Sequence, residues 1–359
     1  MRNILEAYGF SSAEAVIAEE NPEFYPARII AQHQHIYRVL TETDEIYAVT
    51  AGRFNYQAES VSAEYPVAGD WVLVDRLSDD TGQAIIHSIL PRRSAFVRQA
   101  PGGKGLQVVA ANIDFVFICM ALNEDYNLRR LERYLSIAWD SGALPVVVLT
   151  KADICEALDF KLREVEDIAI GVDICITSWE DDHGWQKVKG FLQPGKTGAF
   201  IGSSGVGKST LLNRMLGEEV IRTKAIRNDG KGRHTTTHRE LFLLPEGGMV
   251  IDTPGMREIQ LAAADVDRAF TDIADLASSC RFYDCRHETE PGCAVRAAID
   301  DGLLDEARFI SYQKLLRDQL YEERKASMKA SQIEKQKIID AVGSLSGIKE
   351  ILKHSRKQK

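Results

Sequence analysis

Residues 197–210 read Thr-Gly-Ala-Phe-Ile-Gly-Ser-Ser-Gly-Val-Gly-Lys-Ser-Thr, and this stretch decides the fold. An apolar strand leads into the pattern G-x-x-x-x-G-K-[ST], and a helix is predicted over residues 208–216. In such a turn the glycines let backbone N–H groups surround a phosphate, and the helix N-terminus adds partial positive charge. We interpret the stretch as a phosphate-binding loop (P-loop). The residues expected to hold the phosphates are Gly202, Ser203, Ser204, Gly205, Val206, Gly207, Lys208, Ser209 and Thr210.

A second motif, Asp-Thr-Pro-Gly at residues 252–255, directly follows an apolar run. In a P-loop site, Lys208 is expected to reach the β- and γ-phosphates, and the Ser209 hydroxyl is expected to bind Mg²⁺. We expect Asp252 to bind the same Mg²⁺ through water and the Gly255 N–H to contact the γ-phosphate. Together the two motifs predict a site for a nucleoside triphosphate and magnesium.

A long polar segment, residues 218–238, separates these motifs and contains Gly-Arg-His-Thr-Thr-Thr at 232–237. A polar segment at this place fits one that is ordered by a γ-phosphate. One of its threonines, Thr235 or Thr236, is expected to complete the Mg²⁺ shell, and the sequence does not decide which.

The residue that orients the attacking water is not at its usual place. Many GTPases have a glutamine directly after D-x-x-G, whereas this chain has Met256, whose thioether cannot orient a nucleophile. A polar group from another part of the chain must then orient the water, and slow unassisted turnover is expected. His234, beside the switch threonines, is the candidate, and the alternative is a histidine that merely faces solvent.

A base-recognition motif is predicted at the end of the apolar strand 144–149. The Asp153 carboxylate can accept the N1–H and N2–H of guanine, which adenine does not offer in that geometry, and Lys151 is expected to lie along the base. Thr150 stands where the common N-K-x-D motif has asparagine, so a hydroxyl must replace a carboxamide. A second, weaker match follows strand 172–176, where the backbone is expected to contact the guanine O6. The residues expected at the base are Thr150, Lys151, Ala152, Asp153, Thr177 and Ser178.

The order of the motifs indicates a circular permutation. The guanine motifs at residues 150–153 and 177–178 precede the P-loop, whereas in an ordinary GTPase they follow it. Strands that alternate with helices predict a mostly parallel sheet with both faces covered. Such a fold tolerates the permutation because strand ends that meet in space define the site, and termini at the surface can be rejoined.

Two further units flank the predicted α/β domain. Residues 27–98 contain short strands with period-two alternation, which fit a five-stranded OB-type barrel or an SH3-like barrel. Beyond residue 258 the pattern is helical. We therefore expect three domains: residues 1–100 with an N-terminal extension and an OB-fold RNA-binding barrel, 101–258 with the permuted GTPase domain, and 259–359 with a helical zinc domain and a basic tail.

Three of the six cysteines lie within fourteen positions of one another, in the pattern C-x4-C-x-H-x5-C. Three thiolates and one imidazole fill a tetrahedral Zn²⁺ shell and leave no open position, so one structural zinc is predicted. The alternatives are free buried cysteines and a catalytic zinc without Cys293. The expected ligands are Cys280, Cys285, His287 and Cys293.

Composition indicates where the protein is located and which partners it could bind. Its 45% hydrophobic and 27% charged residues are typical of globular proteins, and no apolar run reaches the roughly 18 residues of a membrane span. We expect a cytoplasmic protein with no membrane contact. The net charge is −9, but residues 324–359 hold ten Lys or Arg against three acids. This tail, residues 324–359, therefore has a net charge of +7. It either binds phosphate-rich surfaces or is a solvated terminus.

Taken together, the barrel, the permuted motifs and the C-x4-C-x-H-x5-C unit resemble the RsgA (YjeQ) family over roughly residues 27–320. In that family the enzyme is a bacterial GTPase that acts in late maturation of the small ribosomal subunit and is stimulated by that subunit. The resemblance implies an OB fold and a zinc domain that bind ribosomal RNA, and a switch histidine, matched here by His234, that takes part in hydrolysis. It does not cover the first 26 residues or the basic tail, whose roles stay open.

Three functional hypotheses follow. The leading one is a GTP hydrolase that binds the small ribosomal subunit and its rRNA and works as a monomer. The second is a zinc-containing RNA-binding protein that uses GTP only as a structural or switch ligand, which the missing glutamine makes conceivable. A P-loop kinase for a small metabolite is disfavoured, because Asp153 reads guanine and no acceptor-site motif is found.

Overall fold

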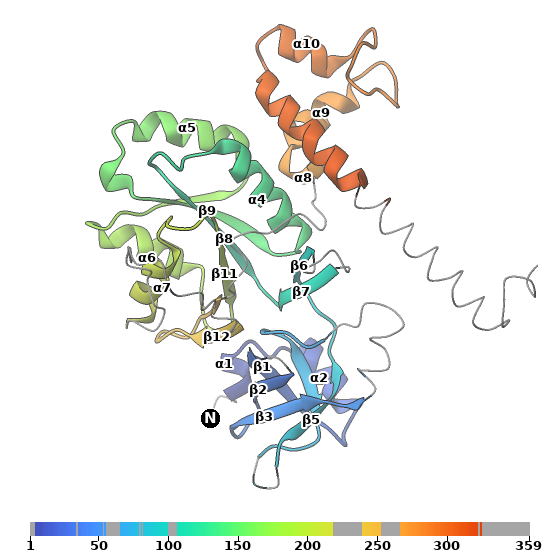
Figure 1. Cartoon of the computed structure of the whole chain (residues 1–359), viewed down its shortest axis with the longest axis vertical. Helices are drawn as coiled ribbons and strands as arrows, with labels where there is room; N and C mark the ends of the chain where they lie inside the picture. Colours follow the sequence, from blue (N-terminus) through green and yellow to red (C-terminus); the bar gives the residue numbers. More distant parts are fainter. Residues whose placement is uncertain are drawn as a thin grey trace, which may run out of the picture.

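The computed structural model describes residues 4–33, 35–52, 54, 65–78, 80, 82–99, 106–217, 239–252, 266–321 and 324. Figure 1 shows an N-terminal barrel, a central α/β layer and a C-terminal group of helices, one after another along the molecule. The first helices, α1 (Ile4–Ala7) and α2 (Ser12–Glu19), lie beside the barrel, and Ser11 begins α2 with a capping box to Glu14.

Five strands close the barrel. They lie in the order β1-β2-β3-β5-β4, and β1 also pairs with β4, so the barrel closes on itself. This closed five-stranded barrel confirms the predicted OB-type unit, whose interior is filled by alternate residues such as Val39, Ala48 and Ile86. The strands are β1 (Tyr25–His33), β2 (Ile36–Leu40), β3 (Glu45–Thr50), β4 (Trp71–Val74) and β5 (Ala84–Ile89).

The central domain is a sheet in the order β10-β9-β8-β11-β13-β12, parallel except for β12. The predicted buried strands and helices of this region are found, and β12, which the sequence analysis missed, forms an antiparallel edge next to β13. The strands are β8 (Phe115–Ala121), β9 (Leu144–Thr150), β10 (Asp173–Ile176), β11 (Thr197–Ile201), β12 (Arg239–Leu243) and β13 (Met249–Asp252).

Helices cover both faces of this sheet, because its buried strands are apolar on both sides. In β8, Ile118 packs with α4 and α5, whereas Phe117 packs with α6 and α7. This arrangement is the doubly wound α/β architecture that alternating strands and helices predict. The helices are α4 (Leu128–Asp140), α5 (Leu158–Ile168), α6 (Asp182–Gly190) and α7 (Lys208–Leu216), with a short 3-10 turn η2 (Ala152–Ile154).

The barrel and the central sheet are joined through the backbone. β1 extends beyond the barrel, and its end pairs with β12 at Ala31–Glu240 and Gln32–Arg239. A hairpin of β6 (Ala95–Gln99) and β7 (Leu106–Ala111) connects the two units, so the domain boundary expected at residue 100 falls between two paired strands.

The C-terminal unit consists of α8 (Val266–Ala269), α9 (Thr271–Ser278), α10 (Ala294–Asp300) and a helix over residues 306–321. Two ion pairs attach it to α4 of the central domain: Arg308–Glu132, which is buried, and Arg129–Asp305, which is exposed. Arg308 bonds Glu132 at 3.0 Å and Asp272 at 2.7 Å, and Arg129 bonds Glu132 at 2.5 Å and Asp305 at 2.7 Å. Glu132 is fully buried and Arg308 nearly so, which makes this contact specific in geometry.

Arg28 of β1 is fully buried where the barrel, the N-terminal helices and the sheet meet. Its guanidinium donates to the Tyr8 carbonyl, to the Thr197 hydroxyl at 2.9 Å and to the Asn112 carbonyl at 3.4 Å, and it lies over the Trp71 ring. Burial, with a smaller effect of nearby Arg93, lowers the pKa of Arg28 to about 10, so the group stays charged at neutral pH.

Arg28→Ala is expected to lower the free energy of unfolding by about 3–5 kcal/mol, because it leaves buried acceptors unpaired and opens a cavity. Chemical denaturation measures the change. Arg38→Ala is the matched control on the neighbouring strand, since its half-exposed ion pairs are worth about 1 kcal/mol or less. Equal losses in the two variants would show that Arg28 does not hold the junction.

Candidate functional site

The P-loop lies between the end of β11 and the start of α7, as the sequence predicts, and its glycines have backbone angles that other residues rarely adopt. Gly205 has φ +82° and Gly207 has φ +101°. Gly202 has φ +143°, and a Cβ there would lie 2.4 Å from the carbonyl oxygen of Cys119 in β8. The first half of the loop therefore lies directly against β8, and this approach requires glycine at position 202.

Lys208 opens α7 and is buried in the loop. Its ammonium donates to the carbonyl oxygens of Gly202, at 2.7 Å, and Ser203, at 2.6 Å. Ser209 follows in the first turn of the helix, and Asp252 ends β13, which pairs with β11. The groups expected at phosphates and Mg²⁺ thus come from neighbouring strands that end at one edge of the sheet.

The two segments predicted to recognise the base are bonded to each other. The Ala152 N–H donates to the Thr177 carbonyl at 3.2 Å, and the Trp179 N–H donates to the Asp153 carboxylate at 3.2 Å. Lys151 adopts a left-handed backbone conformation, φ +60°, which turns the chain out of β9. Residues 150–153 and 177–178 therefore form one surface although 23 residues separate them in sequence.

Thr150 joins this surface to the P-loop. Its hydroxyl donates to the Val206 carbonyl at 2.6 Å, and a Cβ on Gly207 would lie 3.9 Å from its side chain. The hydroxyl at the position of the usual asparagine thus makes a direct contact with the loop. The structure brings the motif at 150–153 and the loop at 202–210 together at one edge of the sheet, despite their reversed order in the chain.

The four predicted zinc ligands also converge. One ligand atom of each of Cys280, Cys285, His287 and Cys293 lies within 4.8 Å of the others. His287 Nδ1 is 3.6 Å from the Cys280 Sγ and 3.3 Å from the Cys293 Sγ, and these two sulfurs are 3.9 Å apart. A tetrahedral zinc ion with thiolate and imidazole ligands places such atoms about 3.5–3.8 Å apart. The cluster has the composition and the spacing to hold one metal ion.

Comparisons with known proteins decide the family. The RsgA GTPase family model matches residues 89–262. Small ribosomal subunit biogenesis GTPase RsgA 2 of Lactiplantibacillus plantarum is 47% identical over 346 residues, which is 96% of each chain. The chain belongs to the RsgA GTPase family. A second relative, Small ribosomal subunit biogenesis GTPase RsgA of Opitutus terrae, is 45% identical over 88% of this chain and 89% of its own.

Solved structures of similar fold agree with this RsgA family assignment. YjeQ from Thermotoga maritima has a TM-score of 0.62 and 27% identity, covering 83% of this chain and 99% of its own. YloQ, described as a circularly permuted GTPase, has a TM-score of 0.59 and 24% identity, covering 82% and 94%. The predicted permuted P-loop fold is therefore confirmed, and as a member of this family the chain is a GTP-hydrolysing enzyme.

Several residues expected in the site of this RsgA family GTPase lie outside the described part of the chain. They are His234, Thr235, Thr236 and Gly255. Among the described helices, none is long and apolar enough to cross a membrane.

Sequence reasoning missed four residues that border the site of this RsgA family chain. Asp125 and Arg130 contact each other beside the P-loop, and Trp179 and Arg214 lie together beside Asp153. The one signal that pointed to them is position, since Asp125 follows a predicted strand that ends at the same edge, and Trp179 follows the weak guanine motif.

Thr150→Val is expected to raise the Kd for GDP and GTP about tenfold, because it removes the hydroxyl that donates to Val206 and keeps the side-chain shape. Thr150→Ser keeps the hydroxyl and is expected to bind like the wild type. Isothermal titration calorimetry measures both. Wild-type affinity in the valine variant would mean that the contact does not support the nucleotide site of this RsgA family GTPase.

Proposed function

We propose that this GTPase acts in late maturation of the small ribosomal subunit, binds its rRNA, and hydrolyses GTP faster when bound to it. Relatives that match nearly the whole chain carry the name small ribosomal subunit biogenesis GTPase. Within the structure, the observation that carries the proposal is the hydrogen bond from Thr150 to Val206, which unites base recognition and phosphate binding in one site.

The guanine specificity is assigned to Asp153. Its exposed carboxylate lies at the mouth of the site, and one of its oxygens is already oriented by the Trp179 N–H. A carboxylate held in this way can accept two N–H groups from the guanine edge, and the Thr177 and Ser178 backbone lies beside it for the O6 atom.

The phosphates are assigned to the loop backbone and to Lys208. The loop N–H groups and the N-terminus of α7 supply partial positive charge, and Lys208 is expected to exchange its carbonyl contacts for the β- and γ-phosphates. Mg²⁺, when bound, neutralises the charge that develops on the phosphates. Ser209, Asp252 and either Thr235 or Thr236 are the residues proposed to hold it.

His234 is proposed to orient the attacking water together with the ribosomal subunit, since Met256 cannot do so. Gly255 is proposed to contact the γ-phosphate. A chain without an intrinsic glutamine at this place is expected to turn over slowly until a partner completes its site.

The metal cluster is proposed to hold one structural Zn²⁺. Three thiolates and one imidazole leave no open position, and burial lowers the pKa of His287, so its ring is neutral and can bind a metal. The barrel and this zinc unit are the surfaces proposed for rRNA, and the protein is proposed to work as a cytoplasmic monomer. The domain divisions proposed are 1–100, 101–258 and 259–359.

The first experiment measures GTP turnover with and without purified small ribosomal subunits. We expect the subunit to accelerate wild-type turnover by at least about tenfold, because a partner that completes a GTPase site acts on the transition state. Asp153→Asn is expected to lose GTP binding and to accept xanthosine triphosphate, whereas the exposed Asp159→Asn keeps wild-type behaviour.

Each part of this assay has a separate outcome that would reject one part of the proposal. Turnover that is unchanged by the subunit would reject the ribosomal role and favour a protein that uses GTP only as a ligand. Unchanged GTP preference in Asp153→Asn would reject the assigned specificity. His234→Ala is expected to lose stimulated turnover and keep GDP affinity, and normal stimulation would remove it from the mechanism.

The second experiment measures zinc content by elemental mass spectrometry. We expect one zinc per chain, lost in Cys280→Ala and kept in Cys155→Ala, whose cysteine lies outside the cluster. Zinc removal is expected to unfold the C-terminal helices first, because binding free energy of a structural site is folding free energy. Full zinc content in Cys280→Ala would contradict the proposed ligand set.

A further inference from the structure

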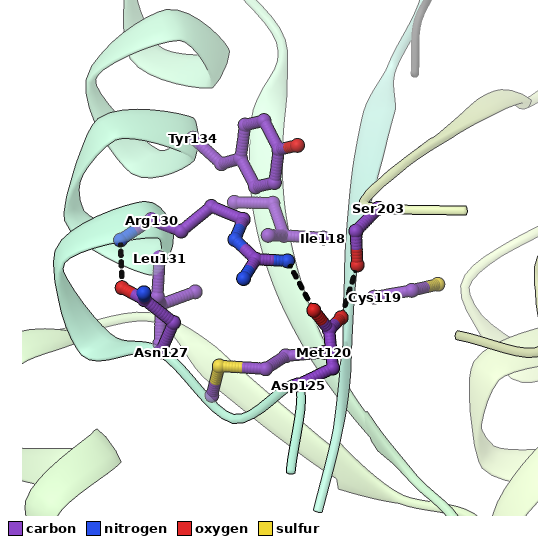
Figure 2. A pocket seen from close by; sticks show the side chains of 9 residues that line it. All are labelled: Ile118, Cys119, Met120, Asp125, Asn127, Arg130, Leu131, Tyr134 and Ser203. Carbon is purple, nitrogen blue, oxygen red and sulfur yellow. Dashed lines mark hydrogen bonds and ion pairs between the residues drawn. The ribbon is translucent and has the colours of Figure 1, made fainter. Parts of the chain in front are cut away.

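Asp125 connects the P-loop to a neighbouring strand. It lies in the segment between β8 and α4, and its two carboxylate oxygens have different partners. One accepts the Ser203 hydroxyl of the P-loop, and the other accepts Arg130 at 2.8 Å. Figure 2 shows this carboxylate between the two groups, in the lining of a small pocket that Ser203 of the loop also borders.

The segment that carries Asp125 is fixed on several sides. The Asp125 N–H donates to the Asn123 side chain at 3.1 Å, and Asn127 caps α4 by accepting the Arg130 N–H at 2.9 Å. The Tyr126 hydroxyl donates to α5 at the Lys161 carbonyl, and Lys161 donates back to the Leu122 carbonyl at 2.9 Å. Asp125 is therefore presented by a braced turn.

The charge of Asp125 is compensated where it lies. Partial burial raises its pKa, but the hydrogen bond from Ser203 and the ion pair with Arg130 outweigh burial and leave the pKa below the ordinary value. The group is thus a carboxylate at neutral pH and can only accept hydrogen bonds. An isolated carboxylate here would repel phosphates, whereas this one is neutralised by Arg130.

The P-loop is consequently held on both flanks by side chains from neighbouring strand ends. On its second half, Thr150 after β9 donates to the Val206 carbonyl. On its first half, Asp125 after β8 accepts from Ser203, next to the close approach of Gly202 to Cys119. The Ser203 hydroxyl is therefore directed toward Asp125, and its carbonyl is directed toward Lys208.

We propose that Asp125 is a positioning residue of the GTP site, which fixes the first half of the P-loop through Ser203 so that its N–H groups and Lys208 meet the phosphates. This inference rests on the proposed function of the loop as the phosphate site. In this proposal Asp125 acts on the loop and not on the nucleotide. It limits the conformations of the loop before the nucleotide arrives, and so lowers the entropic cost of binding.

The experiment measures the Kd for GDP and for a non-hydrolysable GTP analogue, and the melting temperature of the same samples without nucleotide. Asp125→Ala is expected to raise both Kd values about tenfold or more, as for loss of a charge-assisted hydrogen bond. Asp125→Asn keeps an acceptor oxygen for Ser203 and is expected to recover most of the affinity. Glu124→Ala, which removes the same charge from the exposed neighbouring residue, is expected to match the wild type.

A double-mutant cycle separates positioning from general stability. Ser203→Ala is expected to raise Kd as Asp125→Ala does, and the double variant is expected to be no worse than either single variant. Additive losses would overturn the proposal, since the two residues would then act independently.

Other outcomes are equally decisive. Tighter binding by Asp125→Asn would mean that the carboxylate opposes the phosphates, which would overturn the proposal, as would equal Kd values for Asp125→Ala and Glu124→Ala. A wild-type protein that binds neither GDP nor the GTP analogue would instead reject the proposed function itself.

Discussion

The nucleotide site depends on the alignment of four parallel strands that end at one edge of the sheet. The registers pair Ile118 with Ile201, Met120 with Leu149, and Ala199 with Ile251. Parallel pairing therefore places the segments that follow β8, β9, β11 and β13 next to one another. Chain order does not enter this alignment, which explains why a permuted chain builds the same kind of site.

The parts predicted from sequence are those whose chemistry is contained in a short segment. The P-loop, the motif ending at Asp153 and the Cys/His cluster that could hold a metal each combine a fixed spacing with a strand or helix boundary, so the local pattern was enough to find them. The core strands were predictable for the same reason, because near-continuous apolar runs indicate strands buried on both faces.

The parts that were missed depend on tertiary contacts. Asp125 looks like any loop acid until β8 and β11 are paired, and Arg28 looks like a surface residue of an alternating strand. β12 is short, and its place at the sheet edge follows from pairing with β1 and β13 rather than from its own composition. Side chains whose partners are far along the chain leave no periodic signal.

Different types of interaction form the two junctions of the central domain. Backbone pairing between β1 and β12 and the buried Arg28 join it to the barrel. The Arg129–Asp305 and Arg308–Glu132 ion pairs join α4 to the C-terminal helices. The Arg129–Asp305 pair is largely exposed to solvent, so dissolved ions screen it, and they leave main-chain ladders unaffected. High salt is therefore expected to weaken the exposed Arg129–Asp305 pair at the C-terminal junction, whereas the backbone pairing at the barrel junction keeps its strength.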